Sequence, residues 1–322
     1  MNVLLVHSGN AVASSEDYTF VKEQGDALSR LGVSVFYYAV RSKGARGYLK
    51  SLPGLKEAIK AHDIDIVHAH YGLCGALAVL QRKNPVVITF HNGETLTKKG
   101  KLISSVAAWL CSHRIFVAQH IHDKLLPTPR RYDIIPCGID LADFPVIGKD
   151  EARTAMSLPS DCPNILFGGS FSNARKNYPL AKAAVDQLPY RVNLIEMKGF
   201  DRKQVCQLLY GCDLFLLPTK SEGSPQAVKE ALACNCPIVA TGVADIPVLL
   251  DGVDNCYVTG FDAAEVASRI DAVLQCGRRS DGRKRIMELG LDNSLVAQRI
   301  LEIYRKVLGQ NNHSDRSKHG QD

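Results

Sequence analysis

The sequence lacks an apolar run long enough to cross a lipid bilayer. Its longest nearly apolar stretches, YGLCGALAVL at residues 71–80 and LISSVAAWLC at residues 102–111, are about half as long as a membrane-spanning helix. The opening residues, MNVLLVHSGN, contain only a short apolar run with no basic flank, which is typical of a β-strand and not of a secretory signal. We therefore expect a cytoplasmic protein, for which contact with the inner face of a membrane stays open.

Motifs for disulfide, metal and nucleic-acid chemistry are also scarce. Ten cysteines are present, but no C-x-x-C pair occurs, and the nearest two are Cys234 and Cys236. This spacing predicts reduced thiols that pack as small apolar residues. No third ligand follows His68 and His70 at metal-site spacing, so no metal cofactor is expected. Basic residues outnumber acidic ones by only 39 to 33, and KKGK at residues 98–101 is the one basic cluster, which argues against a nucleic-acid partner.

The pattern that is present is an alternation of strands and helices over most of the 322 residues. Short apolar runs are separated by helical patterns, which is typical of parallel βαβ units. The length fits two domains. The predicted strands are 2–8, 33–40, 65–70, 85–92, 114–119 and 132–136 in the first half, and 164–170, 191–197, 213–219, 237–241 and 256–260 in the second. The fold class is therefore α/β, with two Rossmann-like doubly wound domains.

The boundaries follow from composition. We expect a first domain at residues 1–147 and a second at 148–291, with the Pro- and Asp-rich stretch 140–164 as the region that links them. An amphipathic helix at 292–308 could cross back to the first domain. Residues 309–322 carry no large apolar side chain and are predicted to be disordered.

Polar residues follow several predicted strands, at the edge where open α/β sheets bind ligands. These positions are Ser8 and Gly9 after the first strand, His91 after VVITF, and the segments 170–177 and 219–226. Two of the four contain glycine within a polar loop. The carboxyl edges of both sheets are therefore the expected binding sites.

The segment after the strand at 213–219 reads EGSPQAVKE. Ser224 is a good N-cap and a proline follows it, so a helix is predicted at residues 225–234. Its amino end offers free N–H groups and a positive dipole to a phosphate, and Gly223 lets the backbone approach closely. At 100° per residue Glu230 is predicted on the cleft side of this helix, where a carboxylate can accept hydrogen bonds from a ribose diol, with Glu222 farther out along the donor.

These residues resemble a known family. EGSPQAVKEALACNCPIVAT, at residues 222–241, is similar to the E-x7-E signature of the GT4-type retaining glycosyltransferases, which have the two-domain GT-B architecture. IIPCGIDLADFP at 134–145 resembles the end of the family's first domain, with Cys137 in place of the usual Asn. FGGSFSNARKNYPLAKAAVDQL at 167–188 and TFHNGE at 89–94 are similar to two further family segments.

The resemblance implies a role for each matching residue around a sugar nucleotide held between the two domains. Glu230 would accept hydrogen bonds from the ribose hydroxyls, and Glu222 would lie near the donor sugar. The amides of Gly223, Ser224 and Gln226 would help to hold the sugar hydroxyls and the diphosphate.

Further roles follow from the other segments. Lys176 matches a family lysine that stabilises the diphosphate leaving group. The family usually also has an arginine near Ser170, which this chain lacks, and Arg175 is expected to substitute. His91 matches a histidine that contacts the transferred sugar, and Gly9 is the expected point of close approach to the diphosphate.

We therefore expect a retaining glycosyltransferase that transfers a hexose from a UDP-, GDP- or ADP-sugar to a glycan or lipid-linked acceptor, as in polysaccharide or surface-glycan synthesis. No metal is implied, and the D-x-D sequence at residues 63–65 precedes a strand and is interpreted as surface. The alternatives are a GT-B-type sugar-nucleotide epimerase and a non-catalytic protein that binds a sugar nucleotide.

One further stretch, TKKGKLISSVAAWLC at residues 97–111, joins three lysines to an apolar helix with the only tryptophan. It is either an ordinary core helix with a basic start or a contact with an anionic membrane surface.

Overall fold

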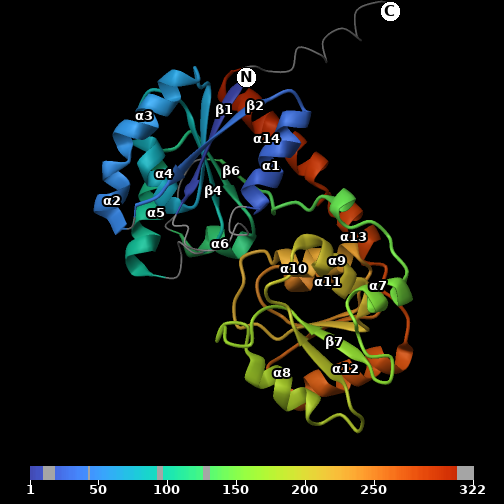
Figure 1. Ribbon diagram of the computed structural model, residues 1–322. Coiled ribbons are helices and arrows are strands. Elements are labelled where there is room, and N and C mark those ends of the chain that lie inside the picture. Colours follow the sequence, from blue (N-terminus) through green and yellow to red (C-terminus); the bar gives the residue numbers. More distant parts are fainter. Residues whose placement is uncertain (10–18, 43, 93–96, 126–130, 310–322) are drawn as a thin grey trace, which may run out of the picture. The chain divides into compact units, whose positions relative to one another are not determined.

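The computed structural model describes residues 1–9, 19–42, 44–92, 97–125 and 131–309. Two compact units are distinguished: unit 1 comprises Met1–Pro136 and the last segment from Ser294, and unit 2 comprises Cys137–Asn293 (Figure 1). Residues 310–322 of the predicted tail at 309–322 lie outside the described residues. Each unit is built on its own parallel sheet flanked by helices, so the predicted α/β class with two doubly wound units is confirmed.

Unit 1 contains a parallel sheet with the strand order β2-β1-β3-β4-β5-β6. Its strands are β1 (Asn2–Ser8), β2 (Ser34–Val40), β3 (Ile66–His70), β4 (Val86–Phe90), β5 (His113–Phe116) and β6 (Tyr132–Ile134). Its helices are α1 (Thr19–Arg30), α2 (Gly44–Lys50), α3 (Leu52–Ala61), α4 (Gly72–Val79), α5 (Lys98–Leu110), α6 (Gln119–Lys124) and α14 (Asn293–Val307). The strand order reverses between β1 and β3, and Gly9 follows the first of these strands.

Unit 2 contains a parallel sheet with the order β11-β10-β9-β7-β8. Its strands are β7 (Asn164–Phe167), β8 (Asn193–Glu196), β9 (Leu214–Leu217), β10 (Ile238–Thr241) and β11 (Cys256–Thr259). Its helices are the short 3-10 helix η3 (Leu141–Asp143), α7 (Lys149–Ala155), α8 (Tyr178–Val185), α9 (Arg202–Gly211), α10 (Gln226–Ala233), α11 (Ile246–Leu250), α12 (Ala263–Cys276) and α13 (Gly282–Glu288). Here the order reverses between β7 and β9, which is where such folds bind nucleotides.

The segment 140–164, expected to link the two domains, is part of unit 2. Phe144 and Ala152 are fully buried in the core that also contains Leu209 and Phe215. The division between the units therefore falls after Pro136, earlier than the range 1–147 proposed from the sequence. Proline and aspartate suggested a loop, but the residues between them include helix α7, which packs on α9 and buries Ala152.

Helix α14 is assigned to unit 1 although it follows all of unit 2 in the sequence. Its buried residues Val296, Ile300 and Tyr304 belong to the same core as Leu5 of β1 and Leu28 of α1. The Tyr304 hydroxyl also hydrogen-bonds Nδ1 of His68, at 2.5 Å. The apolar stripe seen in the sequence is thus the face that closes one side of the first sheet.

Candidate functional site

The carboxylate of Glu222 lies at the centre of a polar cluster in unit 2. Its Oε1 accepts hydrogen bonds from Nζ of Lys176 at 2.9 Å and from Oγ1 of Thr219 at 3.0 Å. Its Oε2 accepts one from Nη1 of Arg175 at 3.0 Å. The carboxylate is only 8% exposed, so two cations share one buried negative charge. The cluster keeps a net positive charge, which suits an anionic ligand.

These residues come from loops that follow neighbouring strands. Lys176 and Arg175 follow β7, and Thr219 and Glu222 follow β9, at the point where the strand order reverses. The stem of Lys176 crosses Gly169, where a Cβ atom would lie 2.9 Å from Cγ of the lysine. Glycine at this position therefore allows Lys176 to reach the carboxylate.

Ser170 occupies the place near which the family resemblance implies an arginine that this chain lacks. Its hydroxyl donates to Oε1 of Glu196 at 2.6 Å, and the Phe171 amide donates to the same oxygen at 2.7 Å. These two hydrogen bonds lower the pKa of Glu196. Arg175 contacts the same carboxylate as Lys176, so the cluster has the second cation that Ser170 cannot supply.

Glu230 lies on α10 and is partly buried. Burial raises the pKa of its carboxyl group, and the nearby cations Arg202, Lys176 and Lys229 act in the opposite direction. Among the described residues, no group donates a hydrogen bond to this carboxylate. Both oxygens can therefore accept hydrogen bonds from a ligand.

The predicted start of α10 is wrong in detail. The helix begins at Gln226, with Pro225 as the N-cap residue and no side-chain cap. Ser224 instead donates its hydroxyl proton to Oδ2 of Asp245, at 2.5 Å. The Asp245 carboxylate follows β10 and lies close to Ser224. The hydrogen bond from the serine hydroxyl to this carboxylate is charge-assisted, so it is stronger than the neutral one that the hydroxyl could accept from a helix amide.

The loop before α10 still presents free donors. The amides of Gly223 and Ser224 make no hydrogen bond with the part of the chain that the structure describes. They lie next to Glu222 in sequence, at the positive end of the helix. The loop can thus offer neutral N–H groups beside the two cations.

A buried lysine on α10 was not singled out by the sequence analysis. Lys229 is fully buried, and its Nζ donates to the carbonyl of Cys137 at 2.7 Å and to Oε1 of Gln226 at 3.0 Å. Nε2 of Gln226 donates in turn to the carbonyl of Gly138 at 2.9 Å. Burial lowers the pKa of Lys229. These side chains fix α10 against the first residues of unit 2. The helical periodicity of the sequence does not indicate this contact, because the two segments are far apart along the chain.

Two predicted site residues belong to unit 1. His91 follows β4, and its Nε2 lies 3.1 Å from Nδ1 of His70 at the end of β3. His70 is fully buried, and burial lowers its pKa well below the usual value. This neutral histidine orients the His91 ring, a role that no pattern in the sequence indicated.

Gly9 is already engaged within unit 1. Its amide donates to the carbonyl of Val40 at 2.6 Å. A Cβ atom at this position would lie 2.9 Å from Cβ of Ala39, so packing against β2 explains the glycine. A diphosphate contact through Gly9 stays a prediction, and residues 10–18 beyond it lie outside the described residues.

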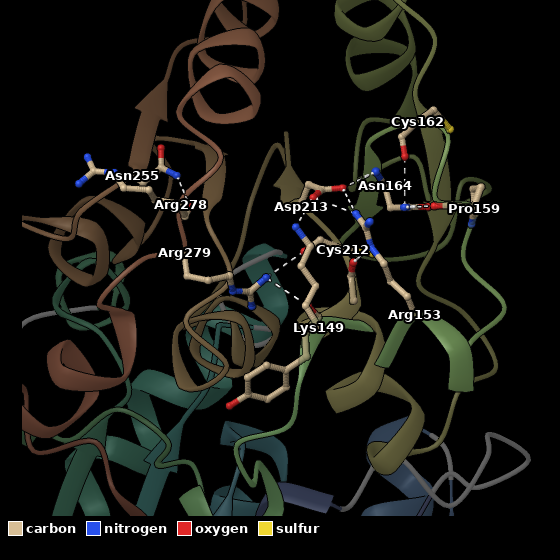
Figure 2. Close-up of polar contacts among 12 residues, drawn as sticks. Lys149, Arg153, Pro159, Cys162, Asn164, Cys212, Asp213, Asn255, Arg278 and Arg279 are labelled. Carbon is tan, nitrogen blue, oxygen red and sulfur yellow. Dashed lines mark hydrogen bonds and ion pairs between the residues drawn. The ribbon is translucent and has the colours of Figure 1, made fainter. Parts of the chain in front are cut away.

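A separate cavity of about 290 Å³ lies at the amino ends of β7 and β9. Asp213 there accepts hydrogen bonds from Lys149 at 2.6 Å, from Arg153 at 2.8 and 3.0 Å and from the Asn164 backbone amide at 2.8 Å (Figure 2). Arg279 donates to backbone carbonyls, including that of Cys212. These contacts hold structural elements together, and none of the predicted site residues lines this cavity.

Within the described part of the chain, none of the helices combines the length and the apolar character that a membrane span requires. No group of three or more His, Cys, Asp or Glu side chains there is arranged to hold a metal ion. All ten cysteines lie in this part and form no disulfide, and Cys234 and Cys236 are fully buried.

Comparison with known families gives two matches that lie side by side along the chain. Residues 12–143 match the model of glycosyltransferase family 4, and residues 164–276 match that of the glycosyl transferases group 1. The second match contains the Glu222 cluster and α10.

Curated relatives include D-inositol 3-phosphate glycosyltransferases of mycobacteria. The protein of Mycobacterium marinum is 26% identical over 281 residues, which cover 71% of this chain and 60% of the relative. The protein of Mycobacterium leprae (strain TN) is 24% identical over 314 residues, which cover 80% of this chain and 73% of the relative. The chain thus spans about 60% of the length of the first of these relatives.

Solved structures share the fold at low sequence identity. Sucrose-phosphate synthase from Thermosynechococcus elongatus has a TM-score of 0.80 at 17% identity, covering 97% of this chain and all of the other. The Anabaena protein HepE in complex with UDP-glucose has a TM-score of 0.75 at 14% identity, covering 95% of this chain and all of the other. These likenesses confirm the predicted fold class.

Proposed function

Because the chain belongs to the glycosyltransferases described by family 4 and group 1, we propose that it transfers a sugar from a nucleoside-diphosphate sugar to an acceptor. The observation that carries this proposal is the Glu222 cluster beside the start of α10. In it, Nζ of Lys176 and Nη1 of Arg175 lie 2.9 and 3.0 Å from the carboxylate oxygens of Glu222. Two cations and two free amides at the carboxyl edge of the sheet suit a diphosphate.

In the proposed reaction the diphosphate is the leaving group. As the glycosidic bond breaks, negative charge grows on the phosphate oxygen, and Lys176 and Arg175 stabilise it because their charges are already positioned. Each charge-assisted hydrogen bond is worth roughly 1.5–3 kcal/mol, so two of them can supply several orders of magnitude in rate. A diphosphate also competes with Glu222 for both cations, which frees the Glu222 carboxylate to accept hydrogen bonds from the sugar.

Glu230 is assigned to the nucleoside end of the donor. Its carboxylate has no hydrogen-bond donor among the described residues, and a ribose diol can supply two. We propose a UDP-, GDP- or ADP-sugar as donor, with no essential metal. The HepE complex with UDP-glucose, a protein of the same fold, supports a sugar nucleotide of this class.

The finer features of the reaction rest on the family resemblance. We propose transfer of a hexose with retention of the anomeric configuration, the leaving phosphate accepting the proton of the attacking hydroxyl. His91 contacts the transferred sugar in this proposal, and His70 orients the ring of His91. The acceptor is a glycan or a lipid-linked glycan of polysaccharide or surface-glycan synthesis.

The direct test incubates the protein with labelled UDP-, GDP- and ADP-sugars and a membrane extract. Transfer of label from one donor to a glycan or lipid fraction is expected. Binding of a donor with neither transfer nor hydrolysis would contradict the proposal. Conversion of the donor to an epimer would show that the protein is an epimerase and would contradict the proposed transfer.

Two substitutions separate the roles of the glutamates. Glu230→Gln is expected to weaken nucleoside diphosphate binding, since an amide accepts fewer hydrogen bonds from the ribose diol. Glu222→Gln is expected to bind the nucleotide as tightly or more tightly, because it releases Lys176 and Arg175, while transfer falls. The matched control is Glu288→Gln, since the Glu288 side chain on α13 is half-exposed and lies outside the cluster, so this variant should leave both binding and transfer unchanged.

A further inference from the structure

Helix α5 turns its large apolar side chains outward. Leu102, Val106, Trp109 and Leu110 are each more than half exposed, whereas Ser104, Ser105, Ala107 and Ala108 of the same helix are buried. At 100° per residue, the four exposed side chains fall within one sector of about 100°. An ordinary core helix has the opposite arrangement, so the interpretation of this segment as a core helix with a basic start is wrong for these side chains.

Neighbouring helices extend this apolar surface. Helix α4 packs against α5, and Leu73 and Leu80 at its two ends are 37% and 38% exposed. Helix α2 packs on α4 and exposes Leu49. Helices α2, α4 and α5 lie on the same side of the unit 1 sheet, opposite α1 and α14 (Figure 1). We call the exposed apolar residues of these three helices, together with their basic residues, the α5 face.

The charges on the α5 face are all of one sign. Helices α2, α4 and α5 contain no aspartate or glutamate, while α2 carries Arg46 and Lys50, and α5 carries Lys98, Lys99 and Lys101. None of the three lysines of α5 is paired with a carboxylate of the described residues. An anionic partner is the one that this charge distribution favours.

The positions of Lys98 and Lys99 strengthen this argument. Both occupy the first turn of α5, where the helix dipole disfavours a cation, and no acidic residue in that turn compensates. By helical geometry both lie on the same side of the helix as Leu102, Val106 and Trp109. These lysines therefore do not stabilise their own helix, and they flank the exposed apolar residues.

We propose that the α5 face docks on the surface of an anionic lipid bilayer. Leucine and valine side chains would enter the boundary between headgroups and acyl chains, Trp109 would lie at the headgroup level, and Lys98 and Lys99 would contact lipid phosphates. A second copy of the chain fits less well, because a two-fold contact would bring the same cations together. Docking goes beyond the proposed sugar transfer and does not depend on it.

The experiment uses Trp109 as its own reporter, since it is the only tryptophan. The full chain is mixed with phosphatidylcholine vesicles that do or do not contain phosphatidylglycerol, without any sugar donor. We expect a blue shift of the tryptophan emission and co-flotation with the anionic vesicles. Each basic residue near anionic lipid contributes about a fivefold change, so neutral vesicles should bind at least about tenfold more weakly, and salt should weaken the binding.

Substitutions at exposed positions test the surface without disturbing the core. Leu102→Glu and Val106→Glu together should abolish the emission shift and the flotation, and Lys98→Glu with Lys99→Glu should reduce them at least about tenfold. Val248→Glu in unit 2 replaces a side chain that is equally exposed and should leave vesicle binding unchanged. Far-ultraviolet circular dichroism checks that each variant is folded.

Three outcomes would overturn the proposal. The first is the absence of both emission shift and flotation with anionic vesicles. The second is equal binding to neutral and anionic vesicles, or binding that survives Leu102→Glu with Val106→Glu. The third is a blue shift that depends on protein concentration without vesicles, which would show that a second copy covers this face. Each leaves the proposed transfer reaction untouched, because none of these measurements involves a donor.

Discussion

At the scale of single residues, the most informative feature is a carboxylate that holds two cations. Glu222 accepts from Lys176, Arg175 and Thr219, although the lysine is 46 positions away in the sequence. Lys176 is 13% exposed, so its charge is poorly screened by water. A phosphate that reaches it gains more than it would from a solvated surface lysine.

We expect Lys176→Met to lower kcat by about 10- to 150-fold, which corresponds to the loss of one charge-assisted contact of roughly 1.5–3 kcal/mol. Arg175→Met should have a smaller effect, because the Arg175 side chain is 47% exposed. Steady-state kinetics with the identified donor measures both. Lys182→Met, on an exposed pair with Asp186, is the control. Equal activity of Lys176→Met and the unsubstituted protein would remove this residue from the mechanism.

A second prediction concerns His68 and acid. Burial lowers its pKa to about 3 from an ordinary value of 6.5, and it hydrogen-bonds Tyr304 and Thr89 as a neutral ring. The unfolded chain therefore takes up a proton on this ring before the folded chain does. The contribution of the neutral His68 ring to the free energy of unfolding of unit 1 should be fully present above about pH 6.5. It should fall by up to about 1.4 kcal/mol per pH unit as the pH drops toward 3.

Denaturant unfolding between about pH 7 and pH 5 measures this slope. His68→Gln retains hydrogen-bonding groups but does not titrate, so its stability should depend less steeply on pH. His70 remains titratable in that variant and keeps part of the dependence. Identical slopes for the variant and the unsubstituted protein would contradict the assignment to His68.

At the scale of elements, α10 is held in place from two sides. Lys229 and Gln226 bind the carbonyls of Cys137 and Gly138, and α13 packs on the helix through Gly282. A Cβ atom at Gly282 would lie 2.8 Å from Cα of Leu232 and 2.9 Å from its carbonyl oxygen. Backbone atoms cannot move aside as a flexible side chain can, so the two helices would have to separate.

Gly282→Ala is therefore expected to destabilise unit 2 by about 1–3 kcal/mol. Because α10 carries Glu230, nucleoside diphosphate binding should weaken as well. Thermal unfolding and nucleotide titration measure the two effects. Gly148→Ala provides the comparison, since the nearest atom to its Cβ would be 3.9 Å away. A variant of Gly282 as stable as that of Gly148 would show that the helices can separate at no cost.

At the scale of the whole molecule, each unit has a core of its own, and α14 completes that of unit 1. We expect calorimetry to resolve two unfolding transitions. Tyr304→Ala should lower the transition of unit 1, since deleting a buried aromatic ring costs about 3–5 kcal/mol. A nucleoside diphosphate at 100 times its Kd should stabilise the other transition by about 2.7 kcal/mol.

The assignment is tested by combining the two changes. The transition lowered by Tyr304→Ala should differ from the one raised by the nucleotide. A nucleotide that raised the Tyr304-sensitive transition would place its main binding contacts in unit 1, contrary to the roles proposed for Glu222 and Glu230.

The sequence by itself determined the two doubly wound units and the edge at which to look for a ligand. Alternating apolar runs and helical patterns are local, and the reversal of strand order places the residues after β7 and β9 together in any such fold. The E-x7-E spacing lies in a loop and the helix that follows it, which nearby residues fix, and through the family resemblance it predicted roles for Glu222 and Glu230 that stay predictions.

Only the tertiary structure decided which groups pair. The convergence of Arg175 and Lys176 on Glu222, the choice of Asp245 as partner of Ser224 and the burial of Lys229 depend on segments distant in sequence. The orientation of α5 is the clearest case. Helical periodicity shows that Leu102, Val106 and Trp109 share one side, but which side a helix turns to its sheet depends on what packs there, and small residues pack closer than leucine or tryptophan.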